Sequence, residues 1–222
     1  MSINVGSTDR TTVRRAPKKT VNDIDTVRAI LDAGLVAHVA CVIDGQPYIM
    51  PVGYARDGDR VLFHGSSASR LFKALADGQP TCFEVTLLDG LVLARSAFES
   101  SMNYRSVIAL GTCTVLEGRE KEEALLRITD HLLPGRTAHA RITAPQENKA
   151  TMMLALDLNE CSCKVSNKFP EDDPEDLVDI RYSNIWAGIV PMKEVFGEPI
   201  PDPLTVEKGI DTPDYVKAWT RG

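Results

Sequence analysis

The fold is decided by residues 35–64, which read LVAHVACVIDGQPYIMPVGYARDGDRVLFH. The stretch holds three runs of β-branched, aromatic and other apolar residues, separated by two Asp-Gly pairs, Asp44-Gly45 and Asp57-Gly58. Asp-Gly supplies the positive φ angles that tight hairpin turns require, so each pair predicts a reversal between adjacent strands. Residues 35–64 therefore predict an antiparallel meander of three strands.

Helical and strand signals lie on both sides of this meander. Before it, Asn22 or Asp23 can cap a helix whose apolar residues recur at helical spacing until Gly34 ends it. Strands outnumber helices without strict alternation, which makes a doubly wound parallel sheet unfavourable. We predict an α+β, mainly β, fold: an antiparallel barrel with peripheral helices. Beyond the meander, the predicted helices are 66–76, 120–133 and 144–153, and the predicted strands are 81–87, 91–98, 106–116, 154–165 and 185–190, with Asp89-Gly90 as a further turn.

The chain divides into three parts of different composition. Residues 1–19 are polar and basic and lack an apolar period, which predicts a flexible arm. Residues 20–192 contain the predicted helices and strands with no linker between them, which predicts one domain. Residues 193–222 are rich in proline and predict a tail that lies along the surface or across a partner.

Charge and cysteine content narrow the classes of function. The chain has 25 basic and 31 acidic residues, a formal charge of −6, whereas nucleic-acid binding needs concentrated Lys and Arg. We expect a small-molecule or protein partner and no nucleic acid. The N-terminus shows no apolar stretch behind a basic start, so we expect neither a membrane span nor a signal peptide, and a cytoplasmic protein. The five cysteines lie in or beside apolar runs and are expected to be reduced, with no metal site.

Residues 64–70, His-Gly-Ser-Ser-Ala-Ser-Arg, follow a strand and open a helix. Free backbone N–H groups and the helix dipole favour an anion at such a position. Gly65 allows close approach, Ser66 and Ser69 offer hydroxyls, and Arg70 offers a bidentate fork for phosphate oxygens. An ordinary serine N-cap with a solvated arginine is the alternative interpretation. His64, at the strand end, is the candidate for contact with a cofactor ring or substrate, and no other catalytic residue is assigned.

Other polar clusters are less specific. Residues 103–106 combine an amide, an aromatic ring, a cation and a hydroxyl, which suits a cofactor pocket, an interface or a plain strand entry. Trp186 opens the final strand and can equally fill the core. No Ser-His-Asp order or metal-binding helix motif is visible.

Five segments, taken in order, point to a known family. They are GQPY at 45–48 followed by Pro51, LFHGSSASRL at 62–71, DGLVLARS at 89–96, SMNYRSV at 101–107 and WAGIVP at 186–191. Together they resemble the pyridoxamine 5′-phosphate oxidase-related flavoproteins, in the branch of the nitroimidazole-reductase-like proteins. The resemblance covers the chain from about Arg14 to Pro191.

The resemblance implies a split β-barrel, an obligate homodimer, and FMN sites at the subunit interface. It implies that Ser66, Ser69 and Arg70, next to Gly65, hold the FMN phosphate, and that His64 borders the isoalloxazine ring. Family members often carry Ser-Gly-Lys where this chain has Ser162-Cys163-Lys164, which keeps the lysine and lacks the glycine. The further residues implied at the cofactor are Pro51, Val52, Gly53 and Tyr54 along the same ring, Tyr104, Arg105, Ser106 and Val107 from the second subunit, and Lys164.

Flavin chemistry needs few side chains, because the cofactor itself accepts or donates hydride. A cation near the N1/O2 edge of the ring would favour the anionic reduced flavin, and Arg105 or Lys164 is the candidate. The first hypothesis is an FMN-dependent oxidoreductase that passes hydride from NADH or NADPH to a small organic acceptor, such as a nitro compound or a quinone. The alternatives are a non-catalytic flavin carrier or sensor, a haem protein with His64 or His38 as axial ligand, and a deazaflavin protein of the same barrel type.

Overall fold

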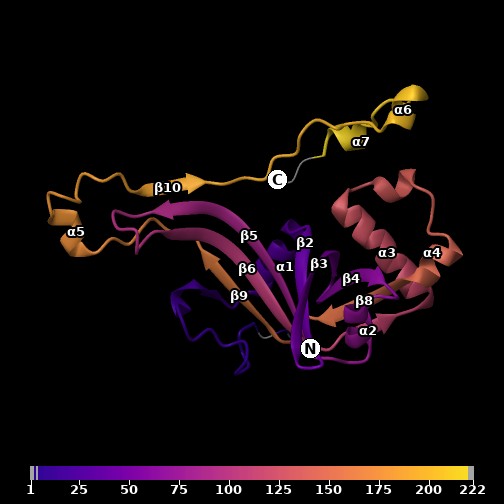
Figure 1. The fold of residues 1–222 in the computed structure, drawn as a ribbon, viewed down its shortest axis with the longest axis horizontal. Coiled ribbons are helices and arrows are strands. Elements are labelled where there is room, and N and C mark those ends of the chain that lie inside the picture. The colour runs from indigo at the N-terminus through magenta and orange to yellow at the C-terminus, as the bar shows by residue number, and fades with distance from the viewer. Residues whose placement is uncertain (1–2, 4, 220–222) are drawn as a thin grey trace.

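The structure is a computed structural model that describes residue 3 and residues 5–219 (Figure 1). The outermost positions of the predicted arm and tail lie outside this range. The helices are α1 (Ile24–Ala33), α2 (Arg70–Ala76), α3 (Gly118–Leu132), α4 (Pro145–Ala150), α5 (Pro174–Val178), α6 (Pro203–Glu207) and α7 (Asp214–Lys217), with 3₁₀ turns η1 (Pro17–Lys19) and η2 (Arg136–His139). The strands are β1 (Thr20–Val21), β2 (Val36–Ile43), β3 (Gln46–Asp57), β4 (Arg60–Ser66), β5 (Thr81–Leu93), β6 (Ser101–Gly111), β7 (Thr114–Leu116), β8 (Thr151–Asp157), β9 (Cys161–Ser166) and β10 (Gly188–Pro191).

Within the described residues, the ten strands form one antiparallel sheet. Its order is β1-β9-β6-β5-β2-β3-β4-β8-β7, with β10 paired to β5. The predicted meander is confirmed, because β2, β3 and β4 are successive antiparallel neighbours. The turn from β2 to β3 consists of Asp44 and Gly45, with φ angles of 52° and 78°. The prediction of an α+β, mainly β, split barrel with peripheral helices is therefore confirmed.

The turn predicted at Asp89-Gly90 is wrong. Strand β5 runs straight through both residues, and its register with β6 shifts between Leu88 and Gly90. Such a bulge absorbs an extra residue without ending the strand. Glycine suits this position because a Cβ there would lie only 3.0 Å from the carbonyl oxygen of Val190 in β10. The predicted strand 91–98 is thus the end of β5 followed by a turn.

Other element boundaries differ from the prediction as well. The strand predicted over 106–116 is two strands, β6 and β7, of which β7 pairs with β8. The single strand predicted over 154–165 is two strands, β8 on β4 and β9 on β6, joined by a short connection. Helix α4 ends at Ala150, because β8 already begins at the next residue. Helix α2 begins at Arg70 instead of Ser66, because β4 continues to Ser66 and pairs it with Thr151.

The main core lies between the barrel strands and helices α1 and α2. Asp23 caps α1 by accepting a hydrogen bond from the Thr26 N–H, and the helix buries its apolar face. The Tyr54 hydroxyl donates to the Leu31 carbonyl at 2.7 Å, which joins β3 to the end of α1. A smaller apolar cluster, with Leu62 as a member, lies under α3. The largest fully buried rings are Tyr54, Phe63, Phe72 and Phe83.

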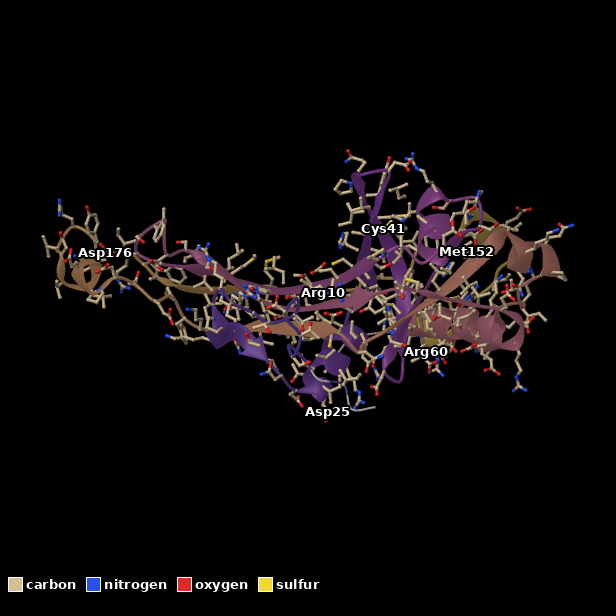
Figure 2. The ribbon with its side chains drawn as sticks, turned by 90° about the horizontal axis from the view of Figure 1, so that it is seen from below. Arg10, Asp25, Cys41, Arg60, Met152 and Asp176 are labelled. Atoms are coloured by element: carbon tan, nitrogen blue, oxygen red, sulfur yellow. The ribbon has the colours of Figure 1, made fainter. Side chains whose placement is uncertain are left out.

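The N-terminal segment predicted to be a flexible arm makes defined contacts with β9. Val5 is buried in the main core, and the Gly6 N–H donates to the Cys161 carbonyl at 2.7 Å. Arg10 forms an ion pair with Glu160 at the turn before β9. Figure 2 shows Arg10 at the middle of the molecule, alongside the long strands. The arm therefore lies over the sheet near β6 and β9.

The β5–β6 hairpin projects away from the barrel, with β10 beside it and α5 near its end (Figures 1 and 2). From β10 the C-terminal tail runs back towards α3 (Figure 1). There the Tyr215 ring stacks on His139 at 4.6 Å between centroids, and its hydroxyl accepts from Arg136 at 2.9 Å. In the described part of the chain, no helix has the length and apolar character needed to cross a membrane. The exposed apolar side chains of the projection include Leu88, Leu91, Leu93, Phe98, Met102, Trp186 and Val190.

Candidate functional site

The predicted phosphate segment lies where β4 ends and α2 begins. The Ser69 N–H donates to the Ser66 carbonyl at 2.9 Å, and the Ala68 N–H donates to Ser66 Oγ at 3.2 Å, which together define a tight turn. Ser69 occupies the N-cap position of α2, yet its hydroxyl makes no capping hydrogen bond. The hydroxyl is therefore available to a ligand, which favours the phosphate interpretation over simple helix capping.

Arg70 completes this segment. Its guanidinium lies over the Tyr48 ring, with Cζ 4.5 Å from the ring centroid. No carboxylate pairs with Arg70 among residues 3 and 5–219. An aromatic face orients a guanidinium without neutralising it. The N–H groups of Arg70 thus stay available to an anion beside Ser66 and Ser69.

Gly65 serves packing. A Cβ at this position would lie 2.3 Å from a ring atom of Phe72 in α2. The missing side chain lets α2 lie close against β4, and this is the role that the structure gives to Gly65. The local sequence also predicts close approach of a ligand at Gly65, because the packing role and the ligand role leave the same local pattern.

His64 precedes the turn and is half-buried. Its Nδ1 atom is buried without a hydrogen-bond partner among the described residues. Burial lowers the pKa of His64, so the imidazole is neutral at pH 7. An unpaired buried ring nitrogen costs free energy, which a hydrogen bond from a bound group would relieve.

The predicted ring-contacting segment of β3 alternates between two faces. Val52 and Tyr54 are buried in the main core, so their side chains point away from any ligand on the outside. Pro51 and Gly53 lie on the other face, where Pro51 pairs with His38 of β2 and a Cβ at Gly53 would lie 3.6 Å from the Leu132 side chain of α3. Only Pro51 among these four predicted contacts therefore presents a side chain to the open outer surface of the sheet.

The same alternation divides the predicted contacts on β6. Tyr104 and Ser106 lie on the outer face, whereas Val107 is fully buried. Arg105 points the other way and makes two hydrogen bonds to the Asp89 carboxylate, at 2.9 and 2.7 Å. Arg105 is thus already paired within its own chain, which its position in the sequence does not reveal. Lys164 lies opposite Ser106 on the outer face.

Two adjoining hollows lie along the outer face of the sheet. One is a groove of about 570 Å³, lined mainly by apolar groups of β2, β3, β5 and β6. The other is a pocket of about 240 Å³ between the N-terminal arm and strands β6 and β9. Arg10 lines both. The pocket is basic, and its charged and hydroxyl lining includes Arg10, Arg14, Arg15, Lys164, Ser106 and Ser162.

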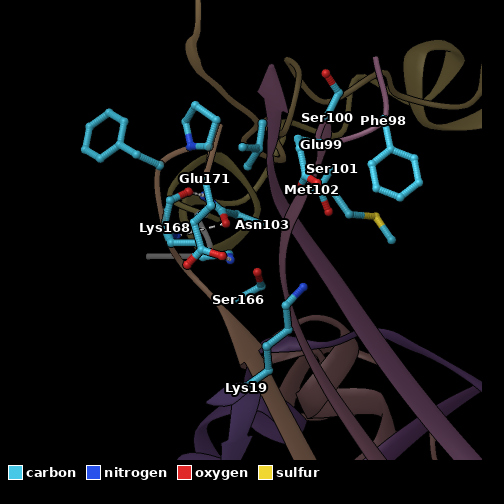
Figure 3. A pocket seen from close by; sticks show the side chains of 13 residues that line it. Lys19, Phe98, Glu99, Ser100, Ser101, Met102, Asn103, Ser166, Lys168 and Glu171 are labelled. Carbon is cyan, nitrogen blue, oxygen red and sulfur yellow. Dashed lines mark hydrogen bonds and ion pairs between the residues drawn. The ribbon is translucent and has the colours of Figure 1, made fainter. Parts of the chain in front are cut away.

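A third pocket, of about 160 Å³, lies near the far end of the projecting hairpin, beside the loop that joins β5 to β6 (Figure 3). Buried Asn103 holds one wall in place: its amide donates to the Lys168 carbonyl at 3.1 Å and accepts from the Lys168 N–H at 3.0 Å. Lys168 pairs with Glu171 at 2.5 Å, and Lys19 lies over the Tyr104 ring. The sequence near Asn103 gives no sign of this role, because Lys168, whose backbone it binds, is distant in the chain.

The remaining reactive and metal-binding side chains form no further site among the described residues. All five cysteines are free thiols, and burial raises the pKa of Cys113 to about 11. Across the residues that the structure describes, no three His, Cys, Asp or Glu side chains are arranged to hold a metal ion.

The chain resembles known proteins in sequence and in structure. The model of the family described as pyridoxamine 5′-phosphate oxidase matches residues 23–165. The flavocytochrome Anf3 from Azotobacter vinelandii is 39% identical, with a TM-score of 0.88 over 99% of this chain and 100% of the flavocytochrome. An FAD- and haem-binding protein from Mycobacterium smegmatis is 38% identical, with a TM-score of 0.85 over 91% of this chain and 98% of the other.

A more distant solved structure shares the fold alone. It is a 5-nitroimidazole antibiotic resistance protein from Bacteroides thetaiotaomicron, 18% identical, with a TM-score of 0.56 over 66% of this chain and 86% of the other. No curated protein sequence matches the chain significantly.

Proposed function

The chain belongs to the pyridoxamine 5′-phosphate oxidase family, and on this premise we propose that it is a flavin-dependent oxidoreductase with a haem as its second redox group. The observation that carries the flavin is the cation of Arg70, which has no carboxylate partner among the described residues and follows Ser69, whose hydroxyl does not cap α2. Electrons would come from NADH or NADPH, and a small organic acceptor of the nitro or quinone type would receive them.

The residues at the end of β4 fit a flavin nucleotide. Arg70, Ser66 and Ser69 would hold its phosphate, and the outward position Pro51 would border its ring. Neutral His64 would offer a ring nitrogen for a hydrogen bond. A bound flavin supplies hydride and single-electron transfer, while the protein orients it and excludes water.

Two flavin nucleotides, FMN and FAD, are candidates for the cofactor. The sequence alone favours FMN, the family's usual cofactor. The Mycobacterium smegmatis relative, 38% identical, binds FAD, and this supports FAD for the present chain. We therefore propose FAD, with FMN as the alternative that the experiment below separates.

The haem proposal rests on the two relatives and on this chain's own imidazoles. One relative is a flavocytochrome and the other binds haem. Of the two candidate ligands, His38 is half-exposed on the outer face of the sheet and His64 has an unpaired ring nitrogen. Imidazole is a common axial ligand of haem iron. The apolar groove and the basic pocket on the same face suit a group with an apolar body and carboxylates.

We also propose that the protein is a homodimer with the flavin at the subunit interface. The projecting hairpin exposes Leu91, Met102 and Trp186, whose apolar surface needs cover in water. Tyr104 and Ser106, on the outer face of β6, would reach the flavin of the second subunit. A second copy supplies a matching hairpin by symmetry.

The full chain, expressed with added haem precursor and purified, tests the proposal through its absorption spectrum. We expect oxidised-flavin bands and a Soret band, FAD in the acid extract by chromatography, and anaerobic bleaching by NADH or NADPH. FMN in the extract would mean that the cofactor is FMN instead of FAD, and it would leave the rest of the proposal unchanged. Failure of both nicotinamides to reduce a bound flavin would favour a carrier or sensor. A preparation without flavin bands would contradict the proposal. If such a preparation then binds an added deazaflavin, the cofactor is a deazaflavin instead of a flavin.

A further inference from the structure

The outer face of the sheet carries a half-exposed histidine beside a carboxylate. His38 Nδ1 lies 3.7 Å from Glu84 Oε2, across the β2–β5 pairing. Its Nε2 has no partner within residues 3 and 5–219, and half of the side chain is exposed. A metal-ligating histidine usually gives its other ring N–H to a carboxylate or carbonyl, which sets the tautomer and raises the basicity of the ligating nitrogen.

The other histidines lack this arrangement. His64 has a buried Nδ1 atom with no partner to orient it. His131 uses Nε2 in a 2.7 Å hydrogen bond with the Gly34 carbonyl. His139 stacks on Tyr215, outside the barrel. His38 is thus the described histidine that lies beside a carboxylate on the outer face of the sheet and has half of its side chain exposed.

The apolar groove begins two residues along β2 from His38, on the same face. Ala40 lies next to His38 on that face and opposite Cys82, which in turn lies opposite Leu110. The groove thereby crosses β2, β5 and β6 next to the imidazole, and its residues include Ala40, Val42, Pro47, Cys82 and Leu110.

The basic pocket lies across the strands from His38. Glu84 is opposite both His38 and Ile108, and Ile108 lines the pocket. Two inter-strand spacings separate His38 from Ile108, or about 10 Å. Arg10 and Arg14 pair with Glu160 and Asp9, whereas Arg15 and Lys164 have no acidic partner within the described range. This pocket offers unneutralised positive charge for carboxylates.

From these juxtapositions we propose that His38 is the axial ligand of the haem iron, that the apolar groove holds the porphyrin, and that the basic arm pocket holds its propionates. The inference rests on the proposed haem cofactor. Glu84 is a positioning residue, because it acts on the iron only through the imidazole. The N-terminal arm becomes part of the haem site through Arg15, which lines the pocket.

The first test replaces the ligand. In full-length protein, His38→Gln should lower the haem-to-flavin ratio at least tenfold or shift the Soret band, and His38→Gly should regain the band when imidazole is added. The flavin content of each variant reports whether it folds. His64→Gln should leave the Soret band in place, and His139→Gln is the matched control on the opposite side of the barrel.

The second test addresses the positioning carboxylate. Glu84→Gln should retain haem but raise its reduction potential, because without the carboxylate charge near Nδ1 the imidazole stabilises ferric iron less. Glu84→Ala should raise it further, and Glu99→Gln, on the projecting hairpin, is the matched control. An unchanged potential in Glu84→Gln would remove the carboxylate from the proposed arrangement.

The third test addresses the propionates. Wild-type protein should retain haem more tightly than haem dimethyl ester, which lacks the two carboxylates. The variant Arg15→Gln should lose at least tenfold of this preference, with the Soret position unchanged because the axial ligand is intact. An equal preference in wild type and variant would place the propionates elsewhere.

The outcomes separate the inference from the proposed function. Wild type that holds haem while His38→Gln keeps the same haem content and spectrum overturns the ligand assignment and leaves the haem function standing. Loss of the Soret band in His64→Gln instead would transfer the ligand role to His64. Wild type that binds flavin but rejects added haem overturns both the haem cofactor and this site.

Discussion

The Arg70 guanidinium lies over the Tyr48 ring, with 4.5 Å between Cζ and the ring centroid. The ring belongs to β3 and the cation to α2, so the contact joins the meander to the proposed flavin-phosphate segment. An arginine held in this way is already oriented before the ligand arrives, which lowers the entropic cost of binding.

We predict that Arg70→Ala weakens flavin binding by about 1.5–3 kcal/mol, the range of one hydrogen bond to a charged group. Fluorescence quenching during titration of the flavin-free protein measures the dissociation constant. The control is Arg119→Ala, which removes an exposed arginine of α3 that pairs only with Glu123. Unchanged affinity in Arg70→Ala would place the phosphate away from this segment.

Gly65→Ala should destabilise the protein by about 1–3 kcal/mol, because overpacking against a buried ring forces atoms apart. The added Cβ would meet the Phe72 ring at 2.3 Å. Denaturant unfolding measures the loss, and Phe72→Leu in the same chain should recover part of it. Gly197→Ala is the matched control, since no atom lies within 4 Å of a Cβ there. Equal stability of the two alanine variants would contradict the packing role.

The neutral state of buried His64 predicts a pH effect on stability. Burial lowers its pKa in the folded protein, whereas the unfolded chain takes up a proton near pH 6.5. Below that pH the unfolded state binds more protons, so acidification destabilises the fold. Urea unfolding from pH 8 to pH 5 should show a smaller loss for His64→Gln than for wild type. Identical pH slopes would mean that His64 titrates normally in the folded protein.

Asn103→Ala should loosen the wall of the hairpin pocket. The variant leaves the N–H and carbonyl of Lys168 without partners, a cost of about 1–3 kcal/mol for each group that stays buried. Hydrogen exchange at the Lys168 amide should accelerate. Asn184→Ala, at an exposed position, is the control. Protection of the Lys168 amide at the wild-type level would show that other contacts hold this segment.

Local signals explain which parts of the fold were predictable. The meander follows from Asp44-Gly45 and Asp57-Gly58, because positive φ angles and strand propensity belong to neighbouring residues. The same dipeptide at Asp89-Gly90 marks a bulge instead of a turn. The difference depends on β6 and β10, which pair with β5 from distant parts of the chain.

The candidate site divides in the same way. The 64–70 segment is continuous, so its serines and arginine could be recognised together as an anion site. The orientation of Arg105 towards Asp89, in contrast, follows from the strand alternation and the bulge beside it. The pairing of Asn103 with the Lys168 backbone likewise had no signal in the neighbouring sequence.

The sequence by itself determined the mainly β architecture, the strand-to-helix anion segment and the family, because turn conformations, apolar periods and short motifs are properties of adjacent residues. Only the tertiary structure decided that Gly65 makes room for Phe72, that Arg105 is occupied by Asp89, and that His38 faces Glu84. These relationships depend on strand register, which brings together groups far apart in the chain and assigns each side chain to one face of the sheet.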